Sequence, residues 1–404
     1  MKISLKSTQI KANEFLFFLS YGLFLIFGIL STSFFYKYFI GNPYKIIIII
    51  SIIILLLKEI FLEKYNIKSL LVALLFVLLI LITWNSGIGI AQKSIPCMLI
   101  FIYSSRKISF MKIAKFTVLI TIFLLFLIIF SSKLGIIMNY ISISKSGRIR
   151  EYLGFRYTLF GPAFLFNITS LIIYIYKEKI KWVVIITLFI MNYFLFLKTN
   201  SRLSFYLSIC LIIISVVLKV KPNIFEKRKF FCYCMIFSFF IGFFIAMHFT
   251  INFNPSNKFY NEVNSILENR LYLGQKSLIE NGINLFGQKI TWVGNGLDAY
   301  GNKSLEAYTY VDSFYIQVLQ KYGLIYTIII GLLYTYTNYK NYKNKDFLYL
   351  LIISLIAFNF IINDLSLSLY YNTFWFPIVS TITKSRIPKR SVKNNNEESK
   401  IIKT

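Results

Sequence analysis

Five arginines lie in three segments of the 404-residue chain that separate strongly apolar runs. A guanidinium group is planar and can donate two parallel hydrogen bonds to the oxygens of a phosphate. We therefore interpret these side chains as a candidate binding site for the diphosphate of an anionic ligand. They are Arg148, Arg150, Arg156, Arg202 and Arg270.

Two other interpretations explain the same arginines without a ligand. Membrane helices are oriented by the sum of the flanking positive charges, so that sum tolerates one basic loop on the outer side. Arg202 follows the short connection Lys198-Thr-Asn-Ser between two apolar runs, and an arginine at a helix end commonly extends to the membrane surface. The sequence alone leaves these alternatives open.

The segment 252–313 combines carboxyl groups with aromatic rings. Asp312, or else Glu306, is a candidate to orient or deprotonate a hydroxyl group, while Arg202 is a candidate to stabilise charge in catalysis. Flat aromatic faces suit the apolar faces of sugars, and the candidates for stacking are Trp292, Tyr300, Tyr308 and Tyr310. Together these residue types fit a lipid-phosphate sugar, although a transporter loop is compatible with them too.

Several other chemistries are excluded by the motifs that the sequence lacks. The chain has no phosphate-binding Gly-Lys-Ser/Thr loop, no His-Glu-x-x-His and no Gly-x-Ser-x-Gly. Its single histidine, His248, lies at the end of an apolar run, which excludes a site with several histidines. We expect no metal and no cofactor.

The elements that would position these residues are membrane helices. The chain is 57% hydrophobic and only 15% charged, with a mean hydropathy of +0.66, whereas soluble chains are about 25% charged. A helix needs roughly 20 apolar residues to cross a bilayer, and the runs here are too long for the alternating strands of a barrel. The net charge of +28 is spread in short clusters between the apolar runs, so we expect no nucleic-acid partner.

We expect an all-α polytopic integral membrane protein with about twelve transmembrane helices and one large external loop. The span near residues 88–103 is the least regular, because Gln92 and Lys93 interrupt it and Pro96 would kink it. The expected spans are 15–35, 44–62, 69–84, 88–103, 113–130, 159–176, 182–197, 203–218, 230–247, 324–336, 347–362 and 367–382.

The distribution of Lys and Arg predicts that both termini are cytoplasmic. With that orientation, the inner segments hold 28 of the 44 basic residues. The expected organisation is helices one to nine in 1–251 with a basic external loop 133–157, a large external loop 252–313, helices ten to twelve in 314–383, and a disordered cytoplasmic tail 384–404. Within the large loop, the apolar spacing over 261–281 predicts one amphipathic helix.

Four local patterns, in order along the chain, resemble the Wzy-type polymerases of O-antigen, capsular and exopolysaccharide repeat units, which belong with the O-antigen ligases. The patterns are Arg148-Ile-Arg150-Glu-Tyr-Leu-Gly154-Phe155 with Gly161-Pro162, then Thr199-Asn-Ser201-Arg202-Leu-Ser, then Gly294-Asn-Gly296, and finally Val311-Asp312-Ser-Phe-Tyr315 continuing to Gly323-Leu. The ligases carry a histidine where this chain has Asp312, which favours a polymerase.

This resemblance implies a metal-independent glycosyltransferase in the cytoplasmic membrane. Its donor and acceptor would both be undecaprenyl-pyrophosphate-linked glycans, joined at the outer face, and the implied partners are the lipid bilayer and the chain-length regulator and flippase of the same pathway. The implied roles are diphosphate binding by Arg148, Arg150, Arg156, Arg202 and Arg270, and acceptor activation by Asp312 or Glu306. The alternatives are a flippase for lipid-linked oligosaccharides and an O-antigen ligase-like transferase.

Overall fold

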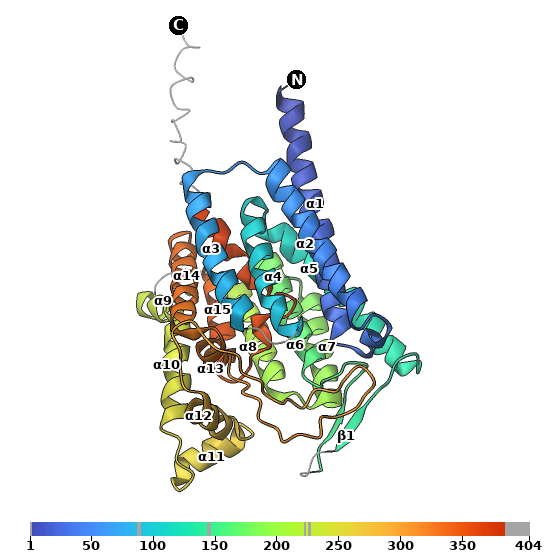
Figure 1. Ribbon diagram of the computed structural model, residues 1–404, viewed down its shortest axis with the longest axis vertical. Coiled ribbons are helices and arrows are strands. Elements are labelled where there is room, and N and C mark those ends of the chain that lie inside the picture. The colour runs from blue at the N-terminus through green and yellow to red at the C-terminus, as the bar shows by residue number, and fades with distance from the viewer. Residues whose placement is uncertain (1, 87–89, 144–146, 222–223, 225–227, 384–404) are drawn as a thin grey trace.

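The computed structural model is almost entirely helical (Figure 1), and it describes residues 2–86, 90–143, 147–221, 224 and 228–383. The α-helices are α1 (Lys2–Ser31), α2 (Asn42–Leu62), α3 (Ile67–Ser86), α4 (Ile90–Ser104), α5 (Phe110–Lys133), α6 (Phe160–Tyr176), α7 (Trp182–Thr199), α8 (Arg202–Val220), α9 (Lys229–Ile236), α10 (Ser238–Ile251), α11 (Lys258–Ile266), α12 (Arg270–Asn281), α13 (Phe314–Lys321), α14 (Gly323–Lys343), α15 (Phe347–Asn359) and α16 (Pro377–Thr383). One antiparallel hairpin joins β1 (Ile141–Ile143) to β2 (Ile149–Glu151). The tail expected at 384–404 lies outside the described residues.

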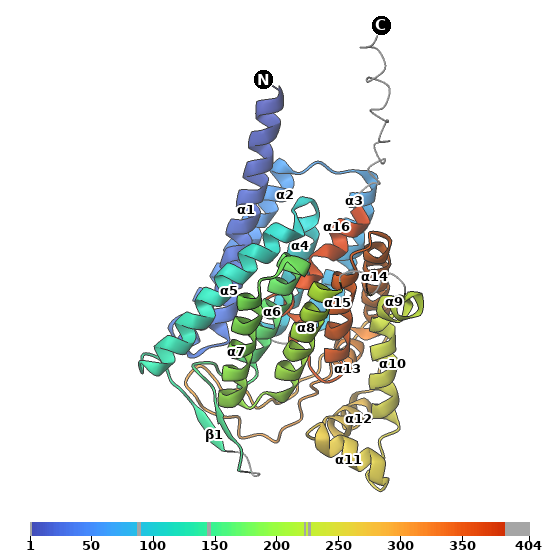
Figure 2. The ribbon, with the colours of Figure 1, turned by 180° about the vertical axis from the view of Figure 1, so that it is seen from behind.

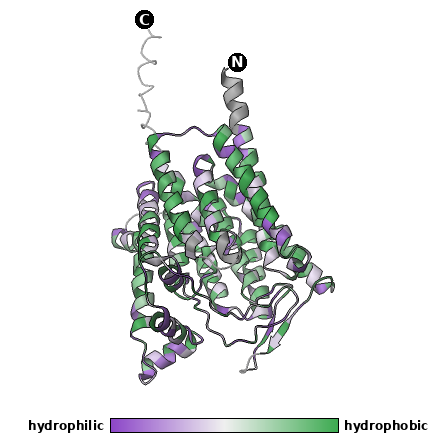
Figure 3. Cartoon of the chain, in the orientation of Figure 1, coloured by the Kyte–Doolittle hydropathy of each residue, from purple (hydrophilic) through white to green (hydrophobic). Residues whose placement is uncertain are grey.

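Six of the described helices are long and apolar enough to cross a membrane. They are α3, α5, α7, α8, residues 11–31 of α1, and α6 together with the residues up to 179. Helices α9 and α10 meet at a bend of 66°, and they add a seventh span if the two are counted as one. Figure 3 shows that these helices consist largely of apolar residues. Many of their large apolar side chains are exposed at the protein surface, as lipid contact requires, among them Leu71, Phe123 and Val183, each more than 60% exposed. The structure therefore agrees with an all-α membrane protein, but it does not confirm twelve spans.

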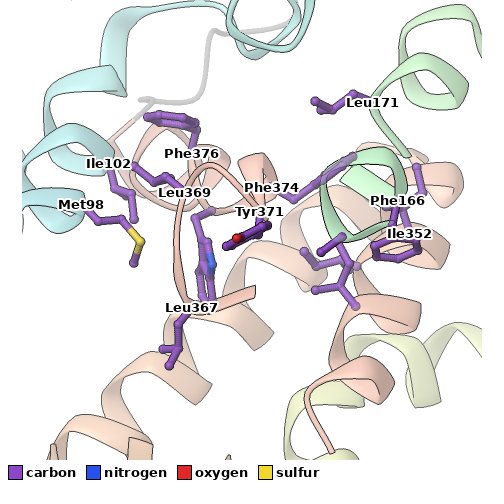
Figure 4. Close-up of a cluster of buried hydrophobic side chains, with 14 of the residues drawn as sticks. Met98, Ile102, Phe166, Leu171, Ile352, Leu367, Leu369, Tyr371, Phe374 and Phe376 are labelled. Atoms are coloured by element: carbon purple, nitrogen blue, oxygen red, sulfur yellow. The ribbon is translucent and has the colours of Figure 1, made fainter. Parts of the chain in front are cut away.

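The expected span 367–382 is not a continuous helix, which corrects the sequence-based prediction. The chain there forms short 3-10 turns at Leu365–Leu367 and Thr373–Trp375 before α16 begins at Pro377. Its side chains are buried in the protein core (Figure 4), where Phe374 is 1% exposed. The run is apolar because protein surrounds it, and irregular backbone is tolerated at membrane depth when it is buried in protein.

Helix α6 lies at the centre of the bundle and packs against α5, α7, α8 and α15 (Figure 2). Nearly all of its side chains are buried, including Phe164 and Leu171, so it is apolar around its whole circumference. Asn167 is one of three buried polar residues on α6, with Thr169 and Ser170, and its amide donates to Thr373 Oγ1 at 3.0 Å. This contact fixes the buried irregular segment against α6.

The β1–β2 hairpin, the α11–α12 pair and the extended segment that follows α12 lie at one end of the bundle (Figure 1). The single amphipathic helix expected over 261–281 is two helices, because Glu268 and Asn269 adopt left-handed backbone conformations with φ of 53° and 67°. After α12, the chain docks on the α13–α14 junction, where Leu324 N donates to Asn284 O at 3.1 Å. The short helix expected after Asp312 is present as α13.

The α2–α3 connection and the beginning of α1 lie at the opposite end of the bundle (Figure 1). A buried network of charges holds this end together. Lys58 Nζ lies 2.9 Å from Glu59 and 3.2 Å from Glu63, and Arg106 Nη1 lies 2.7 Å from Glu59. Each charge has a counter-charge, as burial requires.

Candidate functional site

A cavity of about 680 Å³ opens at the end of the bundle that carries the hairpin and the α11–α12 pair. Its walls come from the hairpin, the beginning of α8, the α11–α12 turn, the segment 294–312 and the turn after α15. The size is within the usual range for ligand pockets. All five sequence-predicted arginines line it: Arg148, Arg150, Arg156, Arg202 and Arg270.

The hairpin presents its two arginines to the cavity. Arg150 lies on β2 and Arg148 directly precedes that strand, while Ile149 between them is 61% exposed. Glu268 pairs with both arginines, at 2.9 Å from Arg148 Nη1 and 3.4 Å from Arg150 Nη2. Burial, together with the positive charge of Arg202, lowers the pKa of Arg148, which indicates a region of concentrated positive charge.

Arg202 enters the cavity from the first turn of α8. Helix α7 ends at Thr199, Asn200 reverses the chain with a left-handed φ of 54°, and α8 begins at Arg202 without a side-chain cap. The free N–H groups of a helix start and its dipole favour a bound anion. Arg202 is exposed, lines the cavity and forms no hydrogen bond or ion pair with the other described residues. It is therefore available to a ligand.

Arg270, the first residue of α12, is held by Asp312. Its Nε lies 3.1 Å from Asp312 Oδ2, and the Tyr308 hydroxyl donates to the same oxygen at 3.0 Å. Burial is the largest single influence and disfavours the charged guanidinium, but the charge and hydrogen bond of Asp312 together with the nearby Tyr157 and Glu268 outweigh it, so the pKa of Arg270 is raised. Arg270 is one of the residues that line the cavity.

Arg156 is committed to the protein backbone more than to the cavity. Its Nε and Nη2 donate to Ser31 O, at 3.1 and 2.5 Å, and its Nη1 donates to Leu297 O at 3.3 Å. These bonds tie the end of α1 to the segment 294–312. We therefore assign Arg156 mainly to positioning the cavity wall.

Asp364 is a cavity residue that sequence reasoning missed. It lies in the turn after α15, and its Oδ2 accepts hydrogen bonds from the Tyr310 hydroxyl and, at 2.9 Å, from Gln317 Nε2. Burial and the nearby charge of Asp312 raise the pKa of Asp364 to about 6. The only feature of the sequence that could have indicated Asp364 is the polar pair Asn363-Asp364 between two apolar runs.

Not every sequence-predicted residue reaches the cavity. Tyr308, Tyr310 and Asp312 line it, but Glu306, Trp292 and Tyr300 do not. The Trp292 ring packs edge-on against Tyr310 and lies under the Lys321 ammonium, 4.2 Å from the ring centroid. Tyr300 and Glu306 are exposed on the loop beyond.

The arrangement is suited to holding an anionic group beside carboxyl groups. Five arginines and three acidic residues, Glu268, Asp312 and Asp364, line the same cavity. Within the described ranges, no cluster of three or more His, Cys, Asp or Glu side chains is placed to hold a metal ion.

Comparisons of the chain with protein-family models, with curated proteins and with solved structures found no match. Its function is therefore inferred from the residues that line the cavity.

Proposed function

We propose that this protein polymerises undecaprenyl-pyrophosphate-linked oligosaccharide repeat units for an O-antigen, a capsule or an exopolysaccharide. In this proposal it is a metal-independent glycosyltransferase. The observation that carries the proposal is the convergence of guanidinium groups from the hairpin, α8 and α12 on one cavity that also holds Asp312 and Asp364.

The chemistry follows from the charges. A hydroxyl oxygen of the acceptor glycan attacks the anomeric carbon of the donor, and the bond from that carbon to the diphosphate breaks with its electron pair on the leaving diphosphate. Arg148, Arg150, Arg202 and Arg270 would neutralise the developing negative charge, and such preorganised donors are often the largest catalytic contribution. No divalent ion is needed for this role.

Apolar residues on the same cavity support a ligand that is also a lipid. Leu159 and Phe160 at the start of α6, Leu203 on α8, and Ile362 and Leu365 after α15 line it beside the arginines. A free sugar phosphate would not use these contacts. An amphiphile with a diphosphate between a lipid tail and a glycan would use both sets.

The proposed location is the cytoplasmic membrane, with both termini in the cytoplasm and the cavity at the outer face. The Lys and Arg distribution supports this orientation, because the segments that would then be cytoplasmic hold 28 of the 44 basic residues. Proposed partners are the bilayer and the chain-length regulator and flippase of the same pathway.

The main competing function is a flippase for lipid-linked oligosaccharides. A flippase needs charged residues along a path between its helices, whereas this cavity takes its charges from loops and helix ends at one end of the bundle. A ligase-like transferase uses the same donor and differs in its acceptor. Glycan length in cells separates the three functions.

The experiment is a deletion of the native gene with analysis of carrier-linked and surface glycans. Loss of a polymerase leaves single repeat units on the carrier and surface, loss of a flippase leaves none outside, and loss of a ligase leaves long unattached chains. The proposal is confirmed if single units accumulate and if the purified protein extends lipid-linked units extracted from the deletion cells. Either of the other two glycan patterns contradicts it.

A further inference from the structure

Two carboxyl groups line the cavity in different surroundings. The Asp312 carboxylate has a positive partner, Arg270, at 3.1 Å. Within the described part of the chain, two side chains donate hydrogen bonds to the Asp364 carboxyl, the Tyr310 hydroxyl and the Gln317 amide; both are neutral and both reach Oδ2. The backbone N–H of Asp364 itself also donates to the carboxyl. No side chain among the described residues donates a hydrogen bond to the other oxygen, Oδ1. A carboxylate with one anchored and one open oxygen is well placed to accept a proton.

The backbone around Asp364 is held rigidly. Its carbonyl accepts a hydrogen bond from Leu367 N at 2.9 Å, and the Asn363 side chain accepts one from Leu365 N at 3.0 Å. Gln317 also donates to Val311 O at 2.6 Å, which links the Asp364 turn to the residue beside Asp312. Catalytic groups need this kind of support from neighbouring hydrogen bonds.

We propose that Asp364 is the catalytic residue that accepts the proton of the acceptor hydroxyl. This inference rests on the proposed polymerase function. As the hydroxyl oxygen bonds to the anomeric carbon of the donor, its proton passes to Oδ1 of Asp364, and the diphosphate leaves with the electron pair of the broken carbon–oxygen bond. The proton then returns to water or to the released diphosphate, which restores the carboxylate.

The surroundings of Asp364 suit a base near neutral pH. Its pKa of about 6 means that the carboxylate is mostly ionised at pH 7 and still basic enough to accept a proton. The charged and titratable groups that influence it are Asp312, Lys321, Tyr157, Tyr310, Tyr322, Tyr370 and Tyr371. Of these, Asp312 raises the pKa of Asp364, and the Tyr310 hydrogen bond and Lys321 lower it.

Asp312 takes a different role in this scheme. Its ion pair with Arg270 and its hydrogen bond from Tyr308 hold the guanidinium in the cavity wall, so Asp312 is a positioning residue. Glu306 does not line the cavity. Asp364 therefore carries the acid–base role that the sequence alone assigned to Asp312 or Glu306.

The test uses the purified full chain and lipid-linked repeat units extracted from cells that lack the gene. Asp364→Asn keeps the shape of the side chain and removes the base, so kcat should fall by ~100-fold or more. Binding of undecaprenyl diphosphate, measured separately, should stay within twofold of wild type. Asp312→Asn is the matched comparison and should weaken binding of that probe as well as turnover.

The pH dependence of kcat/KM distinguishes a catalytic from a purely structural role of Asp364, because a structural role would not change it. The wild-type kcat/KM should rise with pH through a limb at about 6 as Asp364 ionises. Tyr310→Phe removes a hydrogen bond that lowers the pKa of Asp364, so its limb should move to higher pH. Asp364→Asn should lose the limb.

The outcomes separate the two proposals. If the wild-type protein forms no polymer from lipid-linked units, the proposed function fails. If the wild type polymerises but Asp364→Asn keeps more than a tenth of its kcat, Asp364 is not the base. If Asp364→Asn does not bind undecaprenyl diphosphate, the pH dependence of kcat/KM in Tyr310→Phe becomes the test. A pH dependence identical to that of the wild type would then show that Asp364 is not the base.

Discussion

The carboxylate of Glu268 accepts hydrogen bonds from Arg148 through a single oxygen, Oε1, which lies 2.9 Å from Nη1 and 3.3 Å from Nη2. The same oxygen lies 3.4 Å from Nη2 of Arg150. Glu268 and Asn269 both have positive φ at the α11–α12 turn, a conformation that costs of order 1–3 kcal/mol for such residues. The turn thus places a protein carboxylate against two of the arginines that we propose to bind the diphosphate.

Because Glu268 occupies this position, an anionic ligand must displace it. We predict that Glu268→Gln binds inorganic pyrophosphate about 1.4- to fivefold more tightly, the effect of removing a half-exposed ion pair worth roughly 0.2–1 kcal/mol. Titration calorimetry at fixed ionic strength measures this change. Glu280→Gln is the control, since Glu280 lies on α12 outside the cavity and only approaches Lys276, at 3.7 Å. Equal affinities in wild type and Glu268→Gln would show that Glu268 does not compete.

Arg202 should be the most sensitive of the cavity arginines. It is exposed to the cavity at the uncapped start of α8, so the alanine variant should lose ~100- to 1,000-fold in polymerisation rate. Arg202→Lys should recover only part of this, because an ammonium cannot make the two parallel bonds of a guanidinium. Glycan length in complemented deletion cells is the measurement.

Arg228→Ala is the matched control for Arg202, because Arg228 is exposed and does not line the cavity. Its cells should make polymer of normal length. Normal polymer at a normal level of the Arg202→Ala protein would remove Arg202 from the mechanism.

The five arginines that the sequence grouped together line one cavity in the structure, because their position depends on topology. Arg148, Arg202 and Arg270 lie in segments that alternate with apolar runs, so a count of spans places them at the same end of the bundle. The sequence could not predict that the Arg156 guanidinium would donate to the carbonyl of Ser31, 125 residues away. Nothing local in the sequence distinguishes a guanidinium that binds backbone from one that binds a ligand.

Apolar composition also could not separate burial in lipid from burial in protein. The run 367–382 is as apolar as a span, yet Leu369 and Phe374 are buried in the core. Trp292 was predicted to stack on sugars because its ring is flat, but its ring lies under the Lys321 ammonium. Asp364 was missed because one acid in a short turn gains significance only when folding brings it beside Asp312.

The pair Arg270–Asp312 yields a prediction for stability. Both side chains are largely buried, with exposed fractions of 17% and 13%, so Asp312→Asn leaves a guanidinium without its counter-charge. We expect a loss of about 1–3 kcal/mol in the free energy of unfolding, somewhat below the loss for a fully buried pair. Thermal unfolding in detergent measures it.

A double-variant cycle checks the cause of that loss. Arg270→Gln combined with Asp312→Asn removes both charges, so the double variant should be more stable than the sum of the single losses predicts. Strict additivity of the two losses would mean that the ion pair contributes nothing to folding.

Gly323 should be essential for docking the external segment. Its φ is +87°, and a Cβ atom there would lie 2.3 Å from Gly287 N and 2.4 Å from Leu285 O. The carbonyls of Asn284 and Leu285 accept hydrogen bonds from Leu324 N and Ile325 N at the start of α14. Gly323→Ala would force these backbones apart, in addition to the strain of its positive φ.

We therefore predict that Gly323→Ala lowers the free energy of unfolding by at least about 2 kcal/mol. It should also weaken pyrophosphate binding, because the segment 284–288 leads into the cavity wall at Gly294–Leu297. Gly296→Ala is the control for folding, since Gly296 lacks a positive φ and has open space where a Cβ would lie. If Gly323→Ala melted at the wild-type temperature, the external segment would not depend on this junction, and its hydrogen bonds to α14 would not be what holds the cavity wall in place.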